Sequence, residues 1–280
     1  MLERVTSPAG VVYYRSTLLA ATGVVHAFST RIGGVSTGPY ASLNLGNPTG
    51  AQPPDDLANI QQNYQRFTSA LDAAAMHRAW VQQVHSSRVQ LIEWEGETEY
   101  AETLEAEIRD RFHGQTEADA LVTTVPNVLL TVRVADCVPI LLASEDGQWV
   151  AAVHAGWRGI VAGIIGKAIR ALGEAGVLPA QLIAAIGPAI SCPHFEVGPE
   201  VAVAFTRAGL SGAVYDAAEP GGKPHLDLPC AVQFQLSSAG VPVIDTAPLC
   251  TFARADEFFS HRRDHGVTGR LAAVIGRRAP

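Results

Sequence analysis

The sequence has no long apolar run, no excess of basic residues and no leader-like start, and each absence excludes a class of protein. No apolar run reaches the roughly 20 residues needed to span a bilayer. The first residues, MLERVTSPAGVVYYRS, lack the basic head and long apolar segment of a signal peptide. The net charge of −7 gives no reason to expect nucleic acid or an anionic membrane as a partner, whereas small anionic ligands respond to local charge. We therefore expect a cytoplasmic protein.

Cysteine is scarce, and its spacing gives no sign of a disulfide framework. The four cysteines, Cys137, Cys192, Cys230 and Cys250, form no C-x-x-C pair. In a cytoplasmic chain such residues are more often free thiols or metal ligands than disulfide partners. The sequence also lacks a repeat of fixed period and a linker between two cores, and 48% of its 280 residues are hydrophobic. We therefore expect one domain that spans residues 1–280.

Short apolar runs rich in Val, Ile, Tyr and Phe predict strands in much of the chain. These runs cover residues 11–16, 24–29, 79–85, 88–93, 119–124, 128–134, 138–143, 149–155, 181–186, 241–245 and 271–275. Helical patterns cover residues 55–71, 159–176, 199–208 and 228–239. Because strands outnumber helices and cluster in hairpin-like pairs, we expect an α/β fold with mixed or largely antiparallel sheets and helices on the sheet faces.

Two polar stretches interrupt this pattern. Residues 30–50, TRIGGVSTGPYASLNLGNPTG, are typical of a long loop, and Leu43 and Leu45 indicate that the loop is anchored. Residues 93–114, EWEGETEYAETLEAEIRDRFHG, are strongly acidic and lack a sustained apolar stripe. We expect this second stretch to be a solvated, partly helical surface segment without a functional role.

Cys137 and His154 stand at corresponding ends of two neighbouring predicted strands in TVRVADCVPILLASEDGQWVAAVHAGWRG, residues 131–159. A thiol and an imidazole placed in this way can converge on one point. His85, in WVQQVHSS, is the natural third member. A thiolate and two imidazoles are good zinc ligands, and three protein ligands leave a fourth position for water or substrate. Water bound there is acidic enough to supply hydroxide near neutral pH.

The same side chains also fit other kinds of site. Cys137 and His154 can form a thiolate–imidazolium pair, with Asp136 or another carboxylate orienting the imidazole, as in a cysteine hydrolase or amidase. An isolated strand cysteine is often a small core residue, and an isolated histidine is often a hydrogen-bonded structural one. The presence of His85 favours the metal site, but the spacing alone does not decide between these alternatives.

Three further segments contain candidate ligand contacts. In the turn HAGWRG, residues 154–159, Arg158 and the free amides at a helix start can bind an anion such as phosphate, although a tight structural turn is the alternative. Arg31 and Asn44 of the long loop are candidate substrate contacts, with turn capping as the alternative. The segment FFSHRRDHGVTGR, residues 258–270, can bind an anion or hold the fold together, and we favour the structural role.

Seven motifs occur in the following order: TRIGGVSTGPYASLNLG, QQVHSSRV, ADALVTTVPNVLLTVRVADCVPILL, AAVHAGWRG, IGPAISCPHFEVGPEV, HLDLP and CTFARADEFFSHRRDHGVTGR. With these motifs the chain resembles the bacterial laccase-domain family, also named polyphenol oxidase-like, purine nucleoside phosphorylase or peptidoglycan editing factor. The likeness covers residues 25–276, nearly the whole chain, and several of the motifs are specific. The chain departs from the family pattern in VADC for TADC, in SHRRD for SYRRD and in the acidic stretch, none of which removes a proposed ligand.

The resemblance implies a layered α/β/β/α sandwich, shared with a toxin deamidase that uses a Cys–His pair. It also implies one zinc ion per chain, held by His85, Cys137 and His154, the His of QVH, the Cys of ADC and the His of HAGWRG. Family members phosphorolyse adenosine, inosine and methylthioadenosine and deaminate adenosine. We therefore expect a zinc-dependent purine nucleoside phosphorylase with adenosine deaminase activity, as a monomer or small homo-oligomer. The expected catalytic residues are Cys137, His154 and Asp136, and the expected substrate contacts are Arg31, Asn44 and Arg158.

Copper chemistry is tested by the histidine and methionine content. A multicopper oxidase needs clustered histidines, typically in H-x-H pairs, and a blue-copper site commonly has an axial methionine. The sequence has 9 histidines without an H-x-H pair, and its only methionines are Met1 and Met76. We therefore expect no genuine polyphenol oxidase, with a single copper ion as an alternative occupant of the His/Cys/His site. The main alternative function is a Cys–His hydrolase or amidase that edits peptidoglycan precursors.

Overall fold

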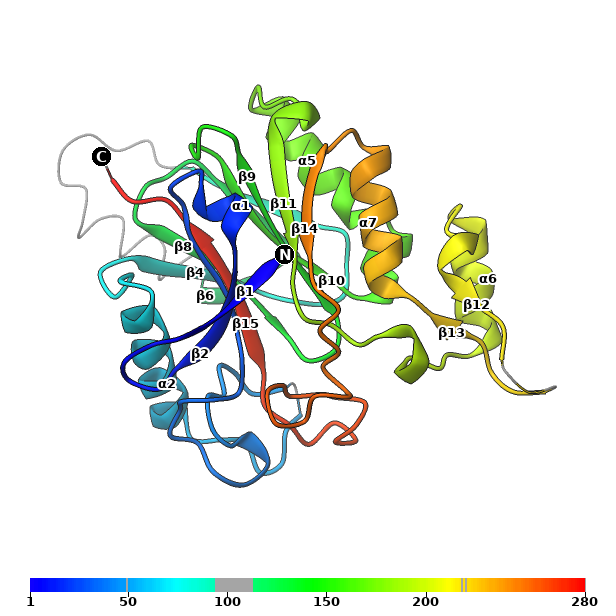
Figure 1. Cartoon of the computed structure of the whole chain (residues 1–280), viewed down its shortest axis with the longest axis horizontal. Coiled ribbons are helices and arrows are strands. Elements are labelled where there is room, and N and C mark those ends of the chain that lie inside the picture. Colours follow the sequence, from blue (N-terminus) through cyan, green and yellow to red (C-terminus); the bar gives the residue numbers. More distant parts are fainter. Residues whose placement is uncertain (49, 94–112, 218, 220, 280) are drawn as a thin grey trace.

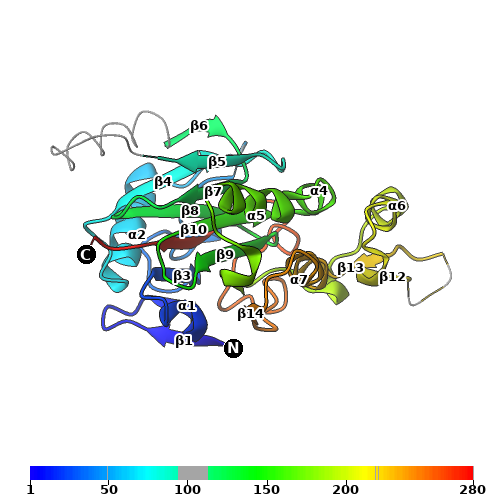
Figure 2. The same ribbon diagram turned by 90° about the horizontal axis from the view of Figure 1, so that it is seen from above.

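Two mixed β-sheets lie face to face at the centre of the molecule, and helices cover their outer surfaces (Figures 1 and 2). This computed structural model describes residues 1–48, 50–93, 113–217, 219 and 221–279. One apolar core fills the space between the sheets, and two others lie between a sheet and its helices. The mixed α/β fold expected from the sequence is confirmed, with the layers in the order α/β/β/α.

The first sheet has seven strands and contains both ends of the described chain. Its order is β1 (Leu2–Thr6), β2 (Val12–Ser16), β3 (Val25–Ser29), β15 (Leu271–Gly276), β8 (Val128–Val134), β4 (His77–Gln82) and β6 (His113–Glu117). Strand β4 runs parallel to β8 and β6, and the remaining neighbours are antiparallel.

The second sheet has six strands and carries the hairpin between residues 138 and 155. Its order is β14 (Val243–Thr246), β11 (Leu182–Ile186), β9 (Val138–Ser144), β10 (Val150–Ala155), β7 (Ala120–Thr123) and β5 (Val89–Ile92). The β14–β11 and β7–β5 pairs are parallel, and the three central pairings are antiparallel. A separate ribbon pairs β12 (Val214–Tyr215) with β13 (His225–Leu226).

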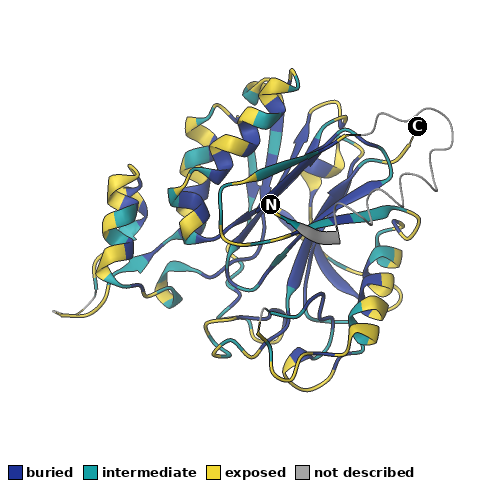
Figure 3. Ribbon diagram, turned by 180° about the vertical axis from the view of Figure 1, so that it is seen from behind, coloured by how far each residue is buried: buried dark blue, intermediate teal, exposed yellow. Residues whose placement is uncertain are grey.

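Helices on each side of the sandwich present one apolar face to a sheet and one polar face outward (Figure 3). Helix α2 (Leu57–Ala70) packs Phe67 against the seven-stranded sheet, and the Asp56 side chain caps its start by accepting from Ala58 N at 2.9 Å. Helices α5 (Ile164–Glu174) and α7 (Leu228–Ser238) cover the six-stranded sheet. No helix in the described part of the chain is long and apolar enough to cross a bilayer.

The structure corrects several boundaries expected from the sequence. The single helix expected over 159–176 is two helices, α4 (Trp157–Val161) and α5, because Gly163 adopts a left-handed φ of 77°. Strand β1, helix α1 (Thr17–Ala20) and the β12–β13 ribbon were not expected. The remaining helix, α6 (Pro199–Arg207), matches its expected range closely, and short 3-10 turns occupy Gly38–Tyr40, Pro179–Gln181, Cys192–His194 and Ser211–Ala213.

Two other expectations concern the polar stretches and the thiols. Residues 94–112 of the acidic stretch lie outside the described residues, and its end, His113–Gly114, begins strand β6. Leu43 and Leu45 are fully buried, which confirms that the long loop is anchored. All four cysteines are free, as expected.

A buried carboxylate joins the two ends of the chain on the seven-stranded side. Glu257 is 4% exposed and accepts from Tyr14 Oη at 2.6 Å and from Arg4 Nε at 2.6 Å, and it also pairs with Arg254 at 2.9 Å. Burial opposes its ionisation, but the hydrogen bonds from Tyr14 and Arg4 and the nearby arginine charges lower the pKa of Glu257 below its usual value. Glu257 therefore stabilises the docking of β1 and β2 against the C-terminal segment.

Replacing Glu257 by Gln is expected to lower the free energy of unfolding at pH 7 by about 1–3 kcal/mol, because buried donors lose a charged acceptor. The pKa of Glu257 is lower in the folded than in the unfolded state. The extra stability of the wild type is therefore fully present above the unfolded pKa of about 4.3, and it is lost as the pH falls through the folded pKa. Urea unfolding at pH 7 measures the stability difference between wild type and variant, and unfolding below pH 4 measures its loss. The control is Glu3→Gln in the exposed Arg15–Glu3 pair, and an equal loss in both variants would contradict the assignment.

Candidate metal centre

The alternation of side chains along β9 and β10 brings Cys137 and His154 to one end of the space between the sheets. Ala152 of β10 and Leu141 of β9 belong to the core between the sheets. His154 lies two residues after Ala152, and Cys137 lies four residues before Leu141, so both side chains point to the same side as those residues. The antiparallel register places His154 opposite Pro139, two residues from Cys137.

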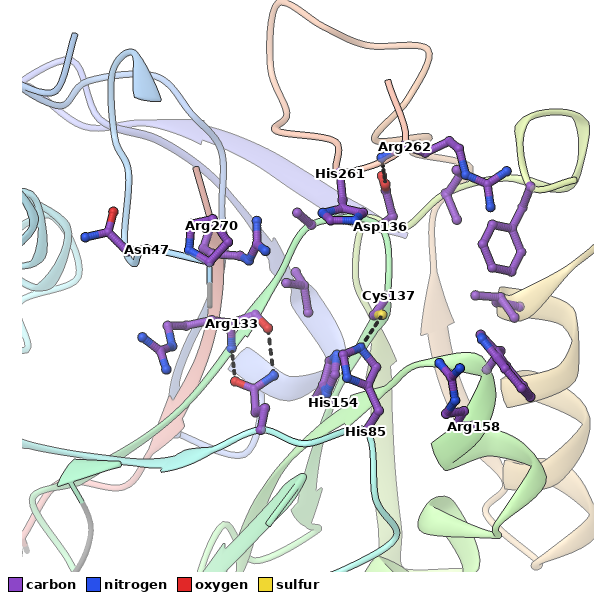
Figure 4. A pocket seen from close by; sticks show the side chains of 18 of the residues that line it. Asn47, His85, Arg133, Asp136, Cys137, His154, Arg158, His261, Arg262 and Arg270 are labelled. Atoms are coloured by element: carbon purple, nitrogen blue, oxygen red, sulfur yellow. Dashed lines mark hydrogen bonds between the residues drawn. The ribbon is translucent and has the colours of Figure 1, made fainter. Parts of the chain in front are cut away.

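His85 reaches the same place from the connection between β4 and β5, which passes from one sheet to the other. Its Nε2 lies 3.8 Å from Cys137 Sγ. Its ring stands edge-on to that of His154, with centroids 4.9 Å apart and an interplanar angle of 74°. One ligand atom from each residue lies within 4.8 Å of the other two (Figure 4). The convergence of the three residues expected from the sequence is therefore confirmed.

The carboxylate of Asp119 holds two of these three residues in place. Asp119 is fully buried just before β7, and its Oδ1 accepts from His154 Nδ1 at 2.8 Å and from His85 N at 3.0 Å. Its Oδ2 accepts from Ser86 N at 2.6 Å, from Ser86 Oγ at 2.7 Å and from Val84 N at 3.3 Å. These bonds fix the backbone turn in which His85 adopts a left-handed φ of 57°.

Asp119 also sets the protonation of His154. Burial opposes ionisation of Asp119, but hydrogen bonds from His154 and Ser86 outweigh it and lower the pKa of Asp119 to about 2. An ionised carboxylate can only accept, so the Nδ1 atom of His154 carries the proton. When His154 is neutral, its Nε2 then has a free lone pair, which is the form required of a metal ligand.

Without a metal, the thiol and the imidazole polarise each other. Burial opposes ionisation of Cys137, but His154 and His85 together lower the pKa of the thiol to about 6. Burial also disfavours a charged His154, but Cys137 and Asp119 raise its pKa to about 9. The thiolate needed for metal binding is therefore accessible at neutral pH.

The HAGWRG turn packs directly against the three ligands. A Cβ atom on Gly156 would lie 2.8 Å from His85 Cδ2 and 3.1 Å from Cys137 Sγ, so no side chain fits there. The turn therefore helps to hold His85 and Cys137 at their present separation.

The donor set fits a tetrahedral zinc ion with one open position. Zinc bonds of about 2.1 Å to nitrogen and about 2.3 Å to sulfur place two such ligands about 3.6 Å apart. The separation of 3.8 Å between Cys137 Sγ and His85 Nε2 matches this value. Among the described residues, these three form the one group of three or more His, Cys, Asp and Glu side chains close enough to share an ion. The part of the chain described thus offers one site with three ligands for a single ion.

The three ligands stand in the wall of a cavity of about 430 Å³ (Figure 4). One wall is cationic, and the facing wall combines aromatic groups with two further arginines. The cationic wall contains Arg133 and Arg270, and the facing wall contains Arg158 and Arg262 (Figure 4), which stack on Trp157 and Phe195.

The other residues singled out in the sequence differ in their relation to this cavity. Asp136 and Arg158 line it. Arg31 and Asn44 do not, and their polar groups bind the protein itself. Arg31 donates to Ala41 O at 2.7 Å, and Asn44 is fully buried with its Nδ2 on Asp55 at 2.9 Å. In this structure Arg31 and Asn44 therefore help to build the loop, and direct substrate contact from them stays an untested prediction.

Asp136 is held as a structural element of the cavity wall. Its Oδ1 accepts from Thr251 Oγ1 at 2.6 Å, and its Oδ2 accepts from Arg262 N at 2.7 Å. Its backbone has a φ of 89°, which a non-glycine residue adopts only when the surroundings hold it. Asp136 thus sets the start of β9, and with it the position of Cys137.

Sequence reasoning missed Asp119 and Arg133, and it named Arg270 only as part of segment 258–270. Each had a local signal: Asp119 precedes the apolar run ALV, Arg133 interrupts the apolar strand TVRV, and Arg270 precedes the apolar strand LAAVIG. For segment 258–270, the structure shows the expected structural role, while anion binding by this segment stays a prediction. Arg263 binds the carbonyl groups of Thr251 and Phe252 at 2.8 and 3.1 Å, whereas other residues of the segment line the cavity.

Replacing Asp119 by Asn is expected to weaken zinc binding by about 10–100-fold, the usual effect of losing a carboxylate that orients a histidine ligand. The Asn amide can donate to His154 Nδ1 and so favour the tautomer that blocks Nε2. Competition titration with a chromogenic chelator measures the affinity. The control is Asp146→Asn in the β9–β10 turn, at the opposite end of both strands, where no change is expected. Unchanged affinity in Asp119→Asn would contradict the role of this carboxylate.

Comparison with known proteins extends over nearly the whole chain. A purine nucleoside phosphorylase of Deinococcus radiodurans is 40% identical over 253 residues, covering 90% of this chain and 89% of that protein. The purine nucleoside phosphorylase YfiH of Shigella flexneri is 34% identical to this chain, and the match covers 90% of this chain and 93% of that protein. The solved structure of YlmD from Geobacillus stearothermophilus is 32% identical, with a TM-score of 0.79 over 95% of this chain and 96% of that one. The family described as multi-copper polyphenol oxidoreductase laccase matches residues 25–278, and the chain belongs to this family.

Proposed function

We propose that the protein is a zinc-dependent purine nucleoside phosphorylase that acts on adenosine, inosine and methylthioadenosine and also deaminates adenosine. The observation that carries the proposal is a set of three metal ligands with an open position, placed in the wall of a cavity that is cationic on one side and partly aromatic on the other. The volume of about 430 Å³ suits a nucleoside and a phosphate. Similar proteins named purine nucleoside phosphorylase support the same reaction.

Phosphorolysis exchanges the C1′–N9 bond of the nucleoside for a C1′–O bond to phosphate, and the purine leaves with the electron pair and takes up a proton. Zinc, when bound, supplies a Lewis acid that polarises an oxygen and lowers the pKa of water, which also serves the addition of water to adenine in deamination. Trp157 and Phe195 offer faces on which a purine can stack, and arginines neutralise the phosphate. Asp136 acts as a positioning residue through Thr251 and the Arg262 backbone.

One observation favours a second function, a metal-free cysteine hydrolase or amidase. Cys137, His154 and Asp119 stand in the order nucleophile, base and orienting carboxylate, with Asp119 2.8 Å from His154 Nδ1. The low pKa of Cys137, about 6, suits a nucleophile. This arrangement accords with the toxin-deamidase-like fold and with an enzyme that edits peptidoglycan precursors. The four free cysteines accord with a cytoplasmic location for either enzyme.

Removing the metal is expected to slow the release of hypoxanthine from inosine and phosphate by at least about 100-fold, because a Lewis acid contributes several kcal/mol to such a reaction. Cys137→Ser and His85→Ala are expected to lose both the metal and the activity. The exposed Cys230→Ser is the matched control and should keep both. Elemental analysis and a coupled base-release assay give the two readouts.

The cysteine hydrolase makes the opposite prediction. Protein purified without added metal would contain no zinc, and alkylation of Cys137 by iodoacetamide would abolish its turnover. Release of base by the zinc-loaded enzyme, restored after stripping by adding zinc back, would rule out that alternative. If neither preparation releases base from inosine, adenosine or methylthioadenosine in the presence of phosphate, the proposed phosphorylase is wrong.

A further inference from the structure

Arg133 and Arg270 line the cavity without a carboxylate partner among the described residues. Both side chains are largely buried. Asp136 is the one carboxylate in the cavity lining, and both of its oxygens are engaged by Thr251 and by the Arg262 backbone. A buried charge without a partner is costly, and two like charges on one wall are more so. The arrangement is therefore typical of a site that receives an anion.

Arg133 is held rigidly from three directions. Its guanidinium lies over the ring of Trp80, 4.5 Å from the centroid. A Cβ atom on Gly46 would lie 2.9 Å from its Cδ, so the loop backbone presses against the side chain. Its main chain exchanges two hydrogen bonds with the Gln83 side chain, at 2.7 and 2.8 Å. Within the described part of the chain, the guanidinium is thus positioned without a bond to an acid.

Arg270 is positioned by the loop that contains Asn44. Asn44 Oδ1 accepts from Arg270 N at 2.8 Å and from Gly46 N at 3.2 Å, so one amide holds both the Arg270 backbone and the glycine that presses on Arg133. The Nη1 atom of Arg270 donates to Gly269 O at 3.1 Å and to Thr268 O at 3.5 Å, and the other guanidinium nitrogens make no hydrogen bond to the described residues. Burial lowers the pKa of Arg270, the nearby Cys137 raises it, and the charge of Arg133 lowers it.

The arginines on the facing wall differ from this pair. Arg158 is exposed and stacks on Trp157 at 4.3 Å. Arg262 is also exposed, stacks on Phe195 at 5.0 Å and donates to Glu196 O at 2.8 Å. Figure 4 shows Arg133 and Arg270 on one side of Cys137 and Arg158 on the other. The more buried pair is the better site for a small dianion, and the aromatic side is left for a flat ring.

We propose that Arg133 and Arg270 bind the inorganic phosphate that attacks the nucleoside, with the purine on the side of Trp157 and Phe195. This assignment rests on the proposed phosphorolysis, and it moves the phosphate away from Arg158, where the sequence had suggested it. Asn44 then acts as a positioning residue that aligns the two guanidinium groups and does not touch the ligand.

The test combines binding and kinetics in the zinc-loaded full-length protein. In wild type, inorganic phosphate is expected to raise the melting temperature in a concentration-dependent way, because it binds only the folded state. Arg270→Met and Arg133→Met are expected to lose this shift and to raise the KM for phosphate by about 10–100-fold while the KM for inosine changes little. Arg158→Gln, on the facing wall, should keep the phosphate-induced shift.

Loss of folding does not obscure the result, because removing an unpaired buried charge should keep or raise the melting temperature without phosphate. Arg270→Lys, which keeps a cation but loses the planar fork, should weaken phosphate binding less than Arg270→Met. A melting shift that persists in Arg270→Met and disappears in Arg158→Gln would overturn the assignment. A larger rise in melting temperature with inosine 5′-monophosphate than with the same concentration of inorganic phosphate would also overturn the assignment. The two arginines would then bind the 5′-phosphate of a nucleotide.

The two proposals fail in different ways. If phosphate stabilises wild type but not Arg270→Met, and no base is released from inosine, the anion site stands and the phosphorylase is wrong. If base is released with an unchanged KM for phosphate in both methionine variants, the phosphorylase stands and the anion site is wrong.

Discussion

The hydrogen bonds of the Asp119 carboxylate are the interaction on which the site depends. This group sits between the end of β10 and the β4–β5 connection, and it serves both at once. By accepting from His154 it fixes a tautomer, and by accepting from three consecutive backbone amides it fixes the turn that aims His85. A buried carboxylate with that many donors stays ionised at any physiological pH, so the ligand geometry does not depend on the protonation state of its support.

In the cavity, some side chains can contact a ligand, and other residues position those side chains. Asn44, Gly46 and Gln83 do not act on the ligand in this scheme, yet they define where the guanidinium groups of Arg133 and Arg270 lie. Preorganisation of this kind lowers the cost of binding, because the side chains lose little freedom when the ligand arrives. The family is described as multi-copper, whereas the described residues offer one three-ligand site.

Period-two patterns in the sequence were sufficient to predict most strands and the meeting of Cys137 with His154, because side-chain direction follows from the strand itself. Strand β1 was missed because LERVT carries charges at an exposed sheet edge and shows little apolar alternation. The bond from the Arg270 backbone to Asn44 could not be predicted, since nothing local in the sequence says whether an amide side chain will face solvent or a distant backbone group. The partners of Asp119 are distant in the sequence, and only the fold brings them together.

The path of the chain through His85 has a consequence for folding. Cys137 and His154 both belong to the six-stranded sheet, whereas His85 lies on the connection that leads there from the seven-stranded one. A chain in which the β4–β5 connection has not yet docked against Asp119 would present two ligands at most, which is too few for a catalytic zinc site. In the proposed zinc enzyme, capture of the ion would thus require that this connection has docked, so metal occupancy would report correct assembly of the site.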